Sequence, residues 1–405
     1  MTGSLLPIAE ARRIVLEVAG TRRATETVPV GHALDRVLAA DVVAAADVPG
    51  FTASAMDGYA IRDLELGADL EVVGESRAGG PFAGRLEPGQ AVRISTGAVA
   101  PAQSEAVIRQ EDVTVAGSRV HLHAAPRPGQ NLRMPGEDMR AGELILAAGR
   151  RLRAPELGAA VAAGAGALPV AVRPPVSILC TGDELRPPGV ELGDGQIHNS
   201  NDPVLRALVS HCGGLPAGDP ASEAPLLDDR QATEAALEAA LERSEVVVVS
   251  GGVSVGPHDH VKPALAGLGV TEHFWRVALQ PGKPTWFGSR GSTLVFALPG
   301  NPVSVAVTFC LFVRPALEAL LGAQPERPPV PEARLAEAVK RNAERDQALR
   351  MSLEFQGGLA TVRPAGAQGS HVFTSLLRGD CLGIVPRGEG FLAAGELIKL
   401  EPLPA

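Results

Sequence analysis

The chain has 405 residues, of which 45% are hydrophobic and 20% are charged, and its formal net charge is -9. A chain of this length exceeds what one hydrophobic core normally serves, which predicts a soluble protein of two to four domains. The negative charge argues against a nucleic-acid-binding or membrane-binding surface, because neutralising phosphates requires a basic face.

Four cysteines lie scattered along the chain without CxxC spacing. This pattern argues against a disulfide framework and a thiolate zinc site, and it favours a reducing, cytoplasmic location. Residues 1–20 lack the pattern of a signal peptide, and the Ala/Gly-rich run 157–172 is too short to span a bilayer. We therefore expect no association with a membrane.

Two separate segments predict an elongated N-terminal domain. Apolar spacing in residues 7–19 and 32–40 predicts two short helices. Residues 139–174 include a helix that begins near Pro155, where proline suits the first turn, and we expect it to pack with the N-terminal helices. The predicted domain combines residues 1–46 with 139–174.

Two further regions predict small β domains, residues 47–138 and residues 326–405. In both, glycine and proline recur between short runs that suit strands. Residues 325–331 have the composition of a linker.

Residues 175–325 predict an α/β domain. Strands at 176–179, 246–249 and 293–298 alternate with helical segments, one of them at about 230–243, which implies a parallel sheet with right-handed crossovers. The four valines 246–249 are apolar on both faces, as expected of a central strand covered by helices on each side.

Polar loops follow three of these strands: 181–184, 250–259 and 299–302. Ligands of open α/β sheets sit beyond the carboxyl ends of the strands, so the glycine- and serine-rich loop after Val249 predicts an anion-binding floor. Carboxylates beside a phosphate need a cation, so Asp183, Glu184 and Asp259 predict Mg²⁺. Taken singly, each loop also fits an ordinary turn or helix cap.

The sequence gives less support for other kinds of nucleotide-binding or metal-binding site. Pro284 follows Gly282-Lys283 where a Walker A loop requires serine or threonine, and no GxGxxG fingerprint is present. His258 and His260 suggest a zinc site, but two loop histidines without a third ligand are more typical of solvated side chains.

Lys283 is held between Pro281 and Pro284, and only four of the 37 basic residues are lysine. A compact ammonium kept in such a frame indicates a point contact with an oxyanion, with chance as the alternative.

Eight motifs occur in an order that resembles the molybdopterin molybdenumtransferases, the MoeA type shared with the E domain of gephyrin. The resemblance covers nearly the whole chain. The motifs are SAMDGYA (54–60), STGA (95–98), GED (136–138), TGDEL (181–185), SGGVSVG (250–256) with Asp259 and Lys262, PGKP (281–284), LPGNPVS (298–304) and GSH (369–371).

The resemblance implies an α/β multidomain fold. The central α/β domain would resemble the molybdopterin-adenylyltransferase fold, flanked by two small β domains and an elongated segment of helices and strands. It also implies an elongated cytoplasmic homodimer, with each site between the α/β domain of one subunit and the β domain of the other. The implied reaction transfers molybdenum from molybdate to adenylylated molybdopterin and releases AMP, with Mg²⁺ assisting.

By matching position, the resemblance implies catalytic roles for Asp57, Thr96, Glu184, Asp259 and Lys283, with Asp259, Glu184 and Asp57 holding the metal. The residues implied for binding the substrates are Ser250, Gly251, Gly252, Ser254, Asp228, Arg133, Asp138, Arg276, Gln280, Pro299, Asn301, Pro302, Arg350 and Ser370.

Arg276 and Gln280 depart from the pattern, since some relatives have lysine there. A neutral donor at Gln280 can still bond an oxo group, but the pocket loses a charge. Two alternatives stay open: a molybdopterin adenylyltransferase, which would consume ATP, and a non-catalytic pterin-binding scaffold. Docking with a molybdopterin adenylyltransferase or with molybdoenzyme chaperones is also expected.

Overall fold

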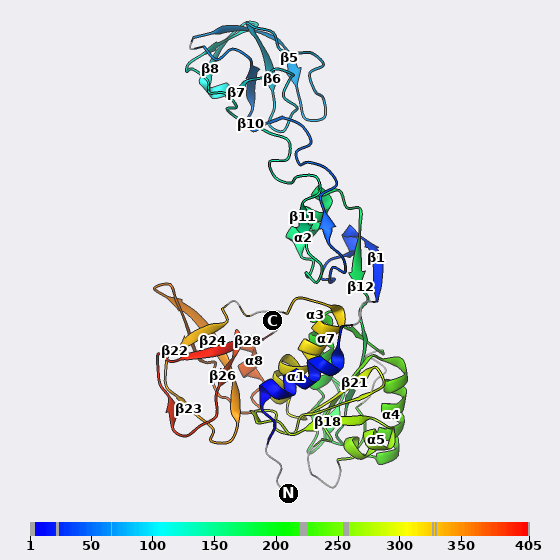
Figure 1. Cartoon of the computed structure of the whole chain (residues 1–405). Helices are drawn as coiled ribbons and strands as arrows, with labels where there is room; N and C mark the ends of the chain where they lie inside the picture. Colours follow the sequence, from blue (N-terminus) through cyan, green and yellow to red (C-terminus); the bar gives the residue numbers. More distant parts are fainter. Residues whose placement is uncertain are drawn as a thin grey trace.

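The computed structural model describes residues 5–21, 24–65, 67–218, 225–253, 259–325, 328 and 330–403. The chain is elongated (Figure 1). A distal β body (residues 53–133) lies at one end and a narrow neck (25–48 and 139–171) follows. At the other end an α/β body (5–21 and 175–321) lies beside a C-terminal β body (332–403). The predicted domain boundaries stay predictions.

The α/β body contains a six-stranded sheet. Four strands are parallel, but two more continue the sheet in antiparallel order, so the prediction of a wholly parallel sheet is wrong at one edge. The reason is a two-residue turn at Gly291, which is too short for a crossover helix. In sheet order the strands are β16 (Leu215–Pro216), β13 (Pro175–Cys180), β17 (Val246–Ser250), β21 (Thr293–Leu298), β20 (Trp286–Arg290) and β18 (Thr271–Trp275).

Helices cover both faces of this sheet. Val246 and Val248 lie in one core cluster, and Val247 and Val249 lie in the cluster on the opposite face. This confirms the predicted central strand, buried on both sides. The first face is covered by α1 (Ile8–Ala19), α3 (Asn201–His211), α6 (Pro302–Thr308) and α7 (Arg314–Leu321), and the second by α4 (Arg230–Arg243) and α5 (Val261–Gly267).

The two predicted N-terminal helices have different outcomes. α1 exists, but its buried stripe of Ala11, Val15 and Ala19 packs with α7 in the α/β body, so its predicted packing within the neck is wrong. The predicted helix at 32–40 is also wrong. A short 3₁₀ turn, η1 (Val30–His32), occurs there instead, and Asp35 at φ 60° interrupts any helix.

Residues Pro302–Leu321 form one helical run of 20 residues. Among the described residues it is the only helix long and apolar enough to cross a membrane, and 94% of its apolar window is buried inside the protein. A π-turn, η3 (Phe309–Val313), separates α6 from α7. Pro315 explains this turn, because it has no N–H to donate to the carbonyl of Leu311.

The neck is a small body with its own core, built from two chain segments, residues 25–48 and 139–171. Val30, Leu38, Leu152 and Leu168 belong to this core. Its elements are β1 (Thr25–Pro29) paired with β12 (Ala167–Ala171), β2 (Val42–Val43) paired with β11 (Leu144–Leu146), and α2 (Ala154–Ala162).

The distal β body is a six-stranded sheet with an added strand pair, in line with the expected β structure. Ile61, Leu70, Val120 and Leu122 form its main core. The sheet runs β7 (Ala106–Arg109), β4 (Gly58–Ile61), β6 (Gln90–Ile94), β5 (Asp69–Ser76), β9 (Arg119–Leu122) and β8 (Val113–Ala116), and the pair is β3 (Ala53–Ser54) with β10 (Leu132–Arg133).

The C-terminal β body closes on itself, because β24 pairs with both β25 and β26. The α/β segment contributes the short strand β19 (Leu279–Gln280), which pairs with β24. The body's own elements are β22 (Glu332–Leu335), β23 (Val339–Lys340), β24 (Asp346–Gln356), β25 (Leu359–Pro364), α8 (Thr374–Leu377), β26 (Cys381–Val385), β27 (Phe391–Leu392) and β28 (Leu397–Pro402).

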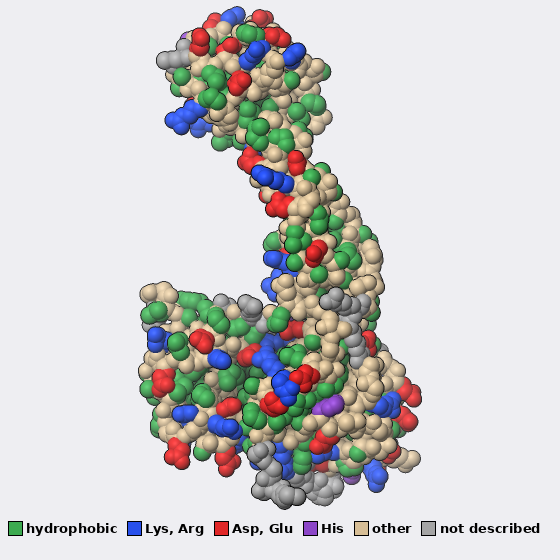
Figure 2. Space-filling model, in the orientation of Figure 1, with side chains coloured by type: hydrophobic (Ala, Val, Ile, Leu, Met, Phe, Trp, Pro, Cys, Tyr) green, Lys and Arg blue, Asp and Glu red, His purple; other side chains and the backbone are tan. Residues whose placement is uncertain are grey.

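Arg314 fastens the C-terminal β body to the α/β body. Its side chain is buried, and its two Nη atoms donate to the Pro402 carbonyl at 2.9 Å and to Glu401 Oε2 at 3.2 Å. On the face shown in Figure 2, acidic and basic side chains are interspersed, and no continuous basic stripe runs over it.

Candidate functional site

The three strands followed by polar loops end side by side. Cys180 pairs with Ser250, and Ser250 pairs with Leu298, so β13, β17 and β21 finish in register. The Thr181 N–H donates to the Ser250 carbonyl at 2.9 Å, and the Gly251 N–H donates to the Leu298 carbonyl at 3.1 Å. The sequence prediction that these loops share one sheet edge is therefore confirmed.

Asn201, at the start of α3, links the loops that follow β17 and β21. Its Nδ2 donates to Ser250 Oγ at 2.9 Å and to the Gly300 carbonyl at 2.7 Å, and the side chain is buried. Ser250, predicted to bind substrate, is itself 1% exposed and is therefore part of the packed floor of the edge. Sequence reasoning missed Asn201, because nothing in its spacing links it to Ser250.

Gly251 and Gly252 adopt φ values of 99° and 64°, which favour glycine. A Cβ on Gly251 would lie 2.6 Å from the Thr181 carbonyl, and one on Gly252 would lie 2.6 Å from Val261 Cγ2. Both positions therefore require glycine for packing within the protein, independently of any bound ligand. Ser254 and His258 lie outside the described residues.

The acidic residues of the first loop lie against the segment before α4. Asp183 Oδ1 accepts the N–H of Asp228 at 3.0 Å, which brings these two predicted site residues together. Glu184 is exposed, and Gly182 leaves room for its carboxylate, since a Cβ there would lie 2.5 Å from Glu184 Oε2. Asp259 precedes α5, at the far end of the loop after β17.

The predicted Mg²⁺ ligands are not assembled within one chain. Asp57 belongs to the distal β body, at the opposite end of the molecule from Glu184 and Asp259 (Figure 1). Across the described ranges, no group of three or more His, Cys, Asp or Glu side chains is placed to hold a metal ion. The residues of a single chain therefore do not fit the predicted metal site.

A pocket of about 300 Å³ lies where the α/β body meets the C-terminal β body, and we call it the seam pocket. It brings together Gln280, Lys283, Pro299, Asn301 and Ser370, which were predicted from five positions along the chain. Its full lining is Gln280, Pro281, Gly282, Lys283, Pro284, Pro299, Asn301, Ser304, Arg345, Gln368, Gly369 and Ser370.

The seam pocket adjoins the edge of the sheet through the loop after β21. Pro299 and Asn301 line the pocket, and Gly300 between them faces the other way. A Cβ on Gly300 would lie 3.8 Å from the Gly251 Cα, so the two loops are in contact. Pro302 opens α6 directly behind.

Arg350 was predicted to lie on the molybdate side, but it is not among the residues that line the seam pocket. Its side chain is wholly buried, and its Nε donates to Ser375 Oγ at 3.0 Å. Its Nη2 approaches the carbonyls of Ala367 and Gly369 at 3.5 and 3.4 Å. Burial lowers the pKa of Arg350 to about 10. Arg350 thus supports the wall that carries Gly369 and Ser370.

Arg276 also lies outside the lining of the seam pocket. Its guanidinium carbon is 4.1 Å from the centroid of the Trp275 ring, and Lys262 Nζ is 3.2 Å from the same centroid. Both cations are thus held on one indole by cation–π contacts. Trp275 Nε1 points to the Val253 carbonyl at 3.4 Å, which places the cluster beside the loop after β17.

The predicted residues of the distal β body lie apart from the seam pocket. Asp57 Oδ1 accepts the N–H of Thr96 at 2.7 Å, and Arg133 and Asp138 line a pocket of about 460 Å³ with Phe51. Three large apolar side chains are exposed in this region: Phe51 at 44%, Met56 at 42% and Met134 at 57%.

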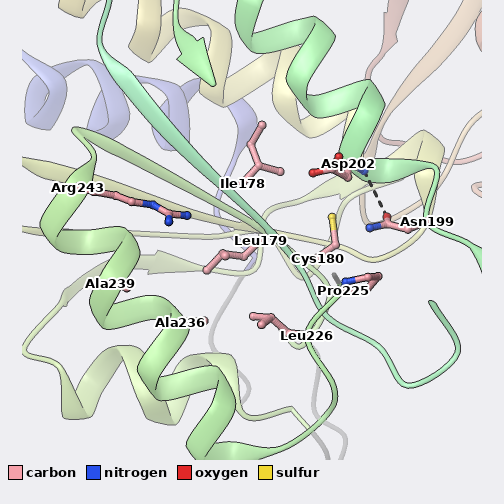
Figure 3. A pocket seen from close by; sticks show the side chains of 10 residues that line it. All are labelled: Ile178, Leu179, Cys180, Asn199, Asp202, Pro225, Leu226, Ala236, Ala239 and Arg243. Carbon is pink, nitrogen blue, oxygen red and sulfur yellow. Dashed lines mark hydrogen bonds between the residues drawn. The ribbon is translucent and has the colours of Figure 1, made fainter. Parts of the chain in front are cut away.

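A further cavity of about 230 Å³ lies beside β13, between α3 and α4 (Figure 3). Ile178, Leu179 and Leu226 give it an apolar floor, and Asp202 and Arg243 lie at its rim. No residue predicted from the sequence lines it. Its polar groups are already engaged, since the Asp202 carboxylate pairs with Arg206 at 3.0 Å and its N–H donates to Asn199 Oδ1.

Sequence reasoning also missed Ser304, Arg345 and Gln368 of the seam pocket. Ser304 stands at the end of the LPGNPVS motif, which could have suggested it. Arg345 and Gln368 belong to another body and carry no motif that could have linked them to Lys283.

Comparison with known sequence families accounts for three successive parts of the chain. Residues 6–164 match the MoeA N-terminal region (domains I and II). Residues 177–319 match a probable molybdopterin binding domain, and residues 332–403 match the MoeA C-terminal region (domain IV).

Individual relatives match over nearly all of the chain. A molybdopterin molybdenumtransferase of Haemophilus influenzae is 35% identical, with 98% of each chain covered. A gephyrin of Dictyostelium discoideum is 30% identical over 98% of this chain and 62% of its own length. The crystal structure of a molybdopterin biosynthesis MoeA protein from Pyrococcus horikoshii superposes with a TM-score of 0.81 at 31% identity, covering 98% of this chain and all of that one.

Proposed function

Because the chain belongs to the MoeA family of molybdopterin molybdenumtransferases and so serves molybdenum cofactor biosynthesis, we propose that it transfers molybdenum from molybdate to adenylylated molybdopterin and releases AMP. The phosphoanhydride of the pterin substrate would lie along the loops that follow β13 and β17. Molybdate would occupy the seam pocket.

The observation that carries this proposal is the contact between the two places. Gly300 abuts Gly251, while its neighbours Pro299 and Asn301 line the seam pocket. A substrate on the strand-end loops would therefore lie next to an oxyanion in the pocket. This proximity is what a transfer between two bound reactants requires.

The lining of the seam pocket suits a tetrahedral dianion. In a protein with a net charge of -9, molybdate needs a local cation, and Lys283 supplies one. The hydroxyls of Ser304 and Ser370 and the amide of Asn301 can donate hydrogen bonds to oxo groups. Lys283, Asn301, Ser304 and Ser370 would thus bind and orient molybdate.

We further propose that the working site forms between two copies of the chain. Asp57 and Thr96 belong to the distal β body, which lies at the opposite end of the molecule from the α/β body and the C-terminal β body (Figure 1). The exposed Phe51, Met56 and Met134 around them are apolar surface that a partner would cover. Asp57 of one subunit would then face Glu184 and Asp259 of the other. Mg²⁺ at such a shared site stays a prediction.

The test is Asp259→Ala, assayed with purified protein, adenylylated molybdopterin and molybdate, with and without Mg²⁺. We expect AMP release and molybdenum transfer both to fall at least about 100-fold, as for loss of a residue that positions the reacting phosphoanhydride. Normal turnover by the variant would refute the role of Asp259. Consumption of ATP would instead identify an adenylyltransferase, and tight pterin binding without turnover would identify a scaffold.

A further inference from the structure

Trp275 ends β18 at the same edge of the sheet as the polar loops. β20 is antiparallel both to β21 and to β18, so β18 runs parallel to β21. The register passes from Val249 of β17 through the facing residues of β21 and β20 to Trp275. Trp275 is therefore level with the end of β17, where the glycine- and serine-rich loop begins.

The indole of Trp275 supports one cation from each of two elements. Lys262 comes from α5 and Arg276 directly follows β18, and their charged groups lie 3.2 and 4.1 Å from the ring centroid. The ring itself is tied to the loop after β17, because its Nε1 donates to the Val253 carbonyl at 3.4 Å. Two like charges on one ring repel each other, and a bound anion would relieve that repulsion.

A carboxylate reaches only one of these two cations. Lys262 Nζ is 3.5 Å from Glu272 Oε2, which also accepts the indole N–H of Trp286 at 2.5 Å. Across the described ranges, the Arg276 guanidinium contacts Trp275 and forms no hydrogen bond or ion pair. Arg276 is half-buried, so its N–H donors are available to an anion from solvent.

The backbone of Arg276 has an unusual conformation that tertiary contacts maintain. Its φ is 71°, in the left-handed region that an arginine rarely adopts. Its N–H donates to the Thr285 carbonyl at 3.0 Å, and its carbonyl accepts the Leu6 N–H at 3.2 Å. Neighbouring side chains of an extended strand point to opposite faces, so this turn of the backbone lets Arg276 lie on the ring of Trp275.

We infer that Trp275 is a positioning residue of the substrate site, which holds Lys262 and Arg276 where both bind the phosphoanhydride of the pterin substrate. The inference rests on the proposed function, which lays this phosphoanhydride along the loops after β13 and β17. Each of its two phosphates carries a negative charge. The lysine would make a point contact and the guanidinium a forked one, while the indole itself touches no substrate.

The direct test is binding of inorganic pyrophosphate to the purified full chain, measured by isothermal titration calorimetry without added metal. We expect Trp275→Leu to weaken binding about 10-fold, because both cations lose their cation–π contact. Trp275→Phe should lose less affinity, since it keeps an aromatic face. Lys340→Gln, which removes an exposed lysine of the C-terminal β body, is the control and should bind like the wild type.

Tryptophan fluorescence gives a readout that a merely structural role would not move. The chain has two tryptophans, and Trp286 is only 2% exposed. Pyrophosphate should change the emission of the wild type but not that of Trp275→Phe. A change that persists in this variant would place the anion elsewhere and overturn the inference. Circular dichroism checks the folding of every variant, and if Trp275→Leu does not fold, Trp275→Phe carries the test through affinity and emission.

Positioning also predicts that the losses do not add. The double variant Lys262→Gln/Arg276→Gln lacks both cations, so adding Trp275→Leu should not weaken pyrophosphate binding further. A further loss in that background would show that the ring contacts the ligand directly, and it would overturn the positioning role.

AMP release from adenylylated molybdopterin separates this inference from the proposed function. Trp275→Leu should raise KM about 10-fold, as for loss of substrate binding. If it binds pyrophosphate and turns over like the wild type, the role of Trp275 is overturned and the proposed reaction stands. If the wild type binds pyrophosphate through Trp275 but releases no AMP, the proposed reaction is overturned and the binding role stands. If the wild type does not bind millimolar pyrophosphate, the inference is overturned, whereas AMP release alone decides the reaction.

Discussion

The two ends of the molecule present polar residues in different ways. At the seam pocket, side chains from two bodies converge within one chain, and buried hydrogen bonds such as those of Asn201 and Arg350 hold the surrounding loops. At the distal β body, the Asp57 carboxylate accepts the backbone N–H of Thr96, and Asp57 stands among exposed apolar side chains. The seam pocket is lined by side chains from two bodies, whereas Asp57 is exposed on the surface of one body.

Under the proposed function, the two ends would contribute unequally to one substrate site. The seam pocket has the cations and hydroxyls that a small oxyanion needs, so its role can be tested by measuring oxyanion binding alone. Under the proposed two-chain site, the contribution of Asp57 in the distal β body is measurable only when two chains meet.

The largest expected effect is at the seam pocket. Lys283→Gln removes the ammonium of the α/β segment from the seam pocket, and we expect molybdenum transfer to fall by about 100-fold or more, because a charge on the bound oxyanion loses its partner. The measurement is molybdenum transfer to adenylylated molybdopterin at saturating pterin. Lys283→Arg, which keeps the charge, is the control and should restore part of the activity. Full activity of the glutamine variant would remove the seam pocket from the mechanism.

Mixing defects from the two ends tests whether they belong to different subunits. Asp57→Ala and Lys283→Gln should each be inactive alone. When they are coexpressed, half of the randomly formed dimers are mixed, and each mixed dimer has one intact site, so about a quarter of wild-type activity should return. The measurement is the activity of the coexpressed mixture, and doubly tagged, tandem-purified mixed dimers should reach about half of wild-type activity. If the mixed dimers are inactive, Asp57 and Lys283 do not act across an interface.

Asn201→Ala should lower the stability of the folded protein, because Asn201 links the loops after β17 and β21. The change leaves the Ser250 hydroxyl and the Gly300 carbonyl without their shared donor, and we expect the free energy of unfolding to fall by about 2 kcal/mol. Urea unfolding followed by circular dichroism measures this change. Gln231→Ala, on the exposed side of α4, is a control that should change stability by less than about 0.5 kcal/mol. Equal stability of the Asn201 variant would show that water replaces its hydrogen bonds.

The smallest effect is a difference in thiol labelling. All four cysteines are buried, none lies in the distal β body, and burial with the nearby Asp380 raises the pKa of Cys381 to about 11. At pH 8 the Cys381 thiolate is thus scarce, and its labelling should increase only as the pH rises toward that pKa. Native protein should react slowly with a thiol reagent at pH 8, whereas Met134→Cys, at an exposed position, should add one fast thiol. Protection of that thiol as protein concentration rises would report contact between copies, and fast labelling of the unsubstituted chain would contradict the buried positions.

Several features of the fold could be predicted locally. The valine strand, the helix at 230–243 and the β character of residues 47–138 follow from apolar periodicity and from the spacing of glycine and proline. The convergence of three strand ends followed from the rule that parallel strands share a carboxyl edge. These features depend on residues close together in the sequence, or on a general rule of sheet topology.

Other features depended on contacts between distant segments. The same apolar stripe on α1 would suit the neck or the α/β body, and only the available surface on α7 decides between them. Arg350 and Arg345 lie five positions apart on one side of a linker, and neither their composition nor their spacing says which one is buried and which lines the seam pocket.

By itself, the sequence determined the central valine strand, the helix at 230–243, the polar loops after three strands and the family of chemistry that its motifs resemble, because periodicity, turn residues and motif order are properties of neighbouring residues. Only the tertiary structure decided that Lys283 and Arg345 share a pocket and that Asp57 stands apart from it, because these relations depend on how separate bodies pack.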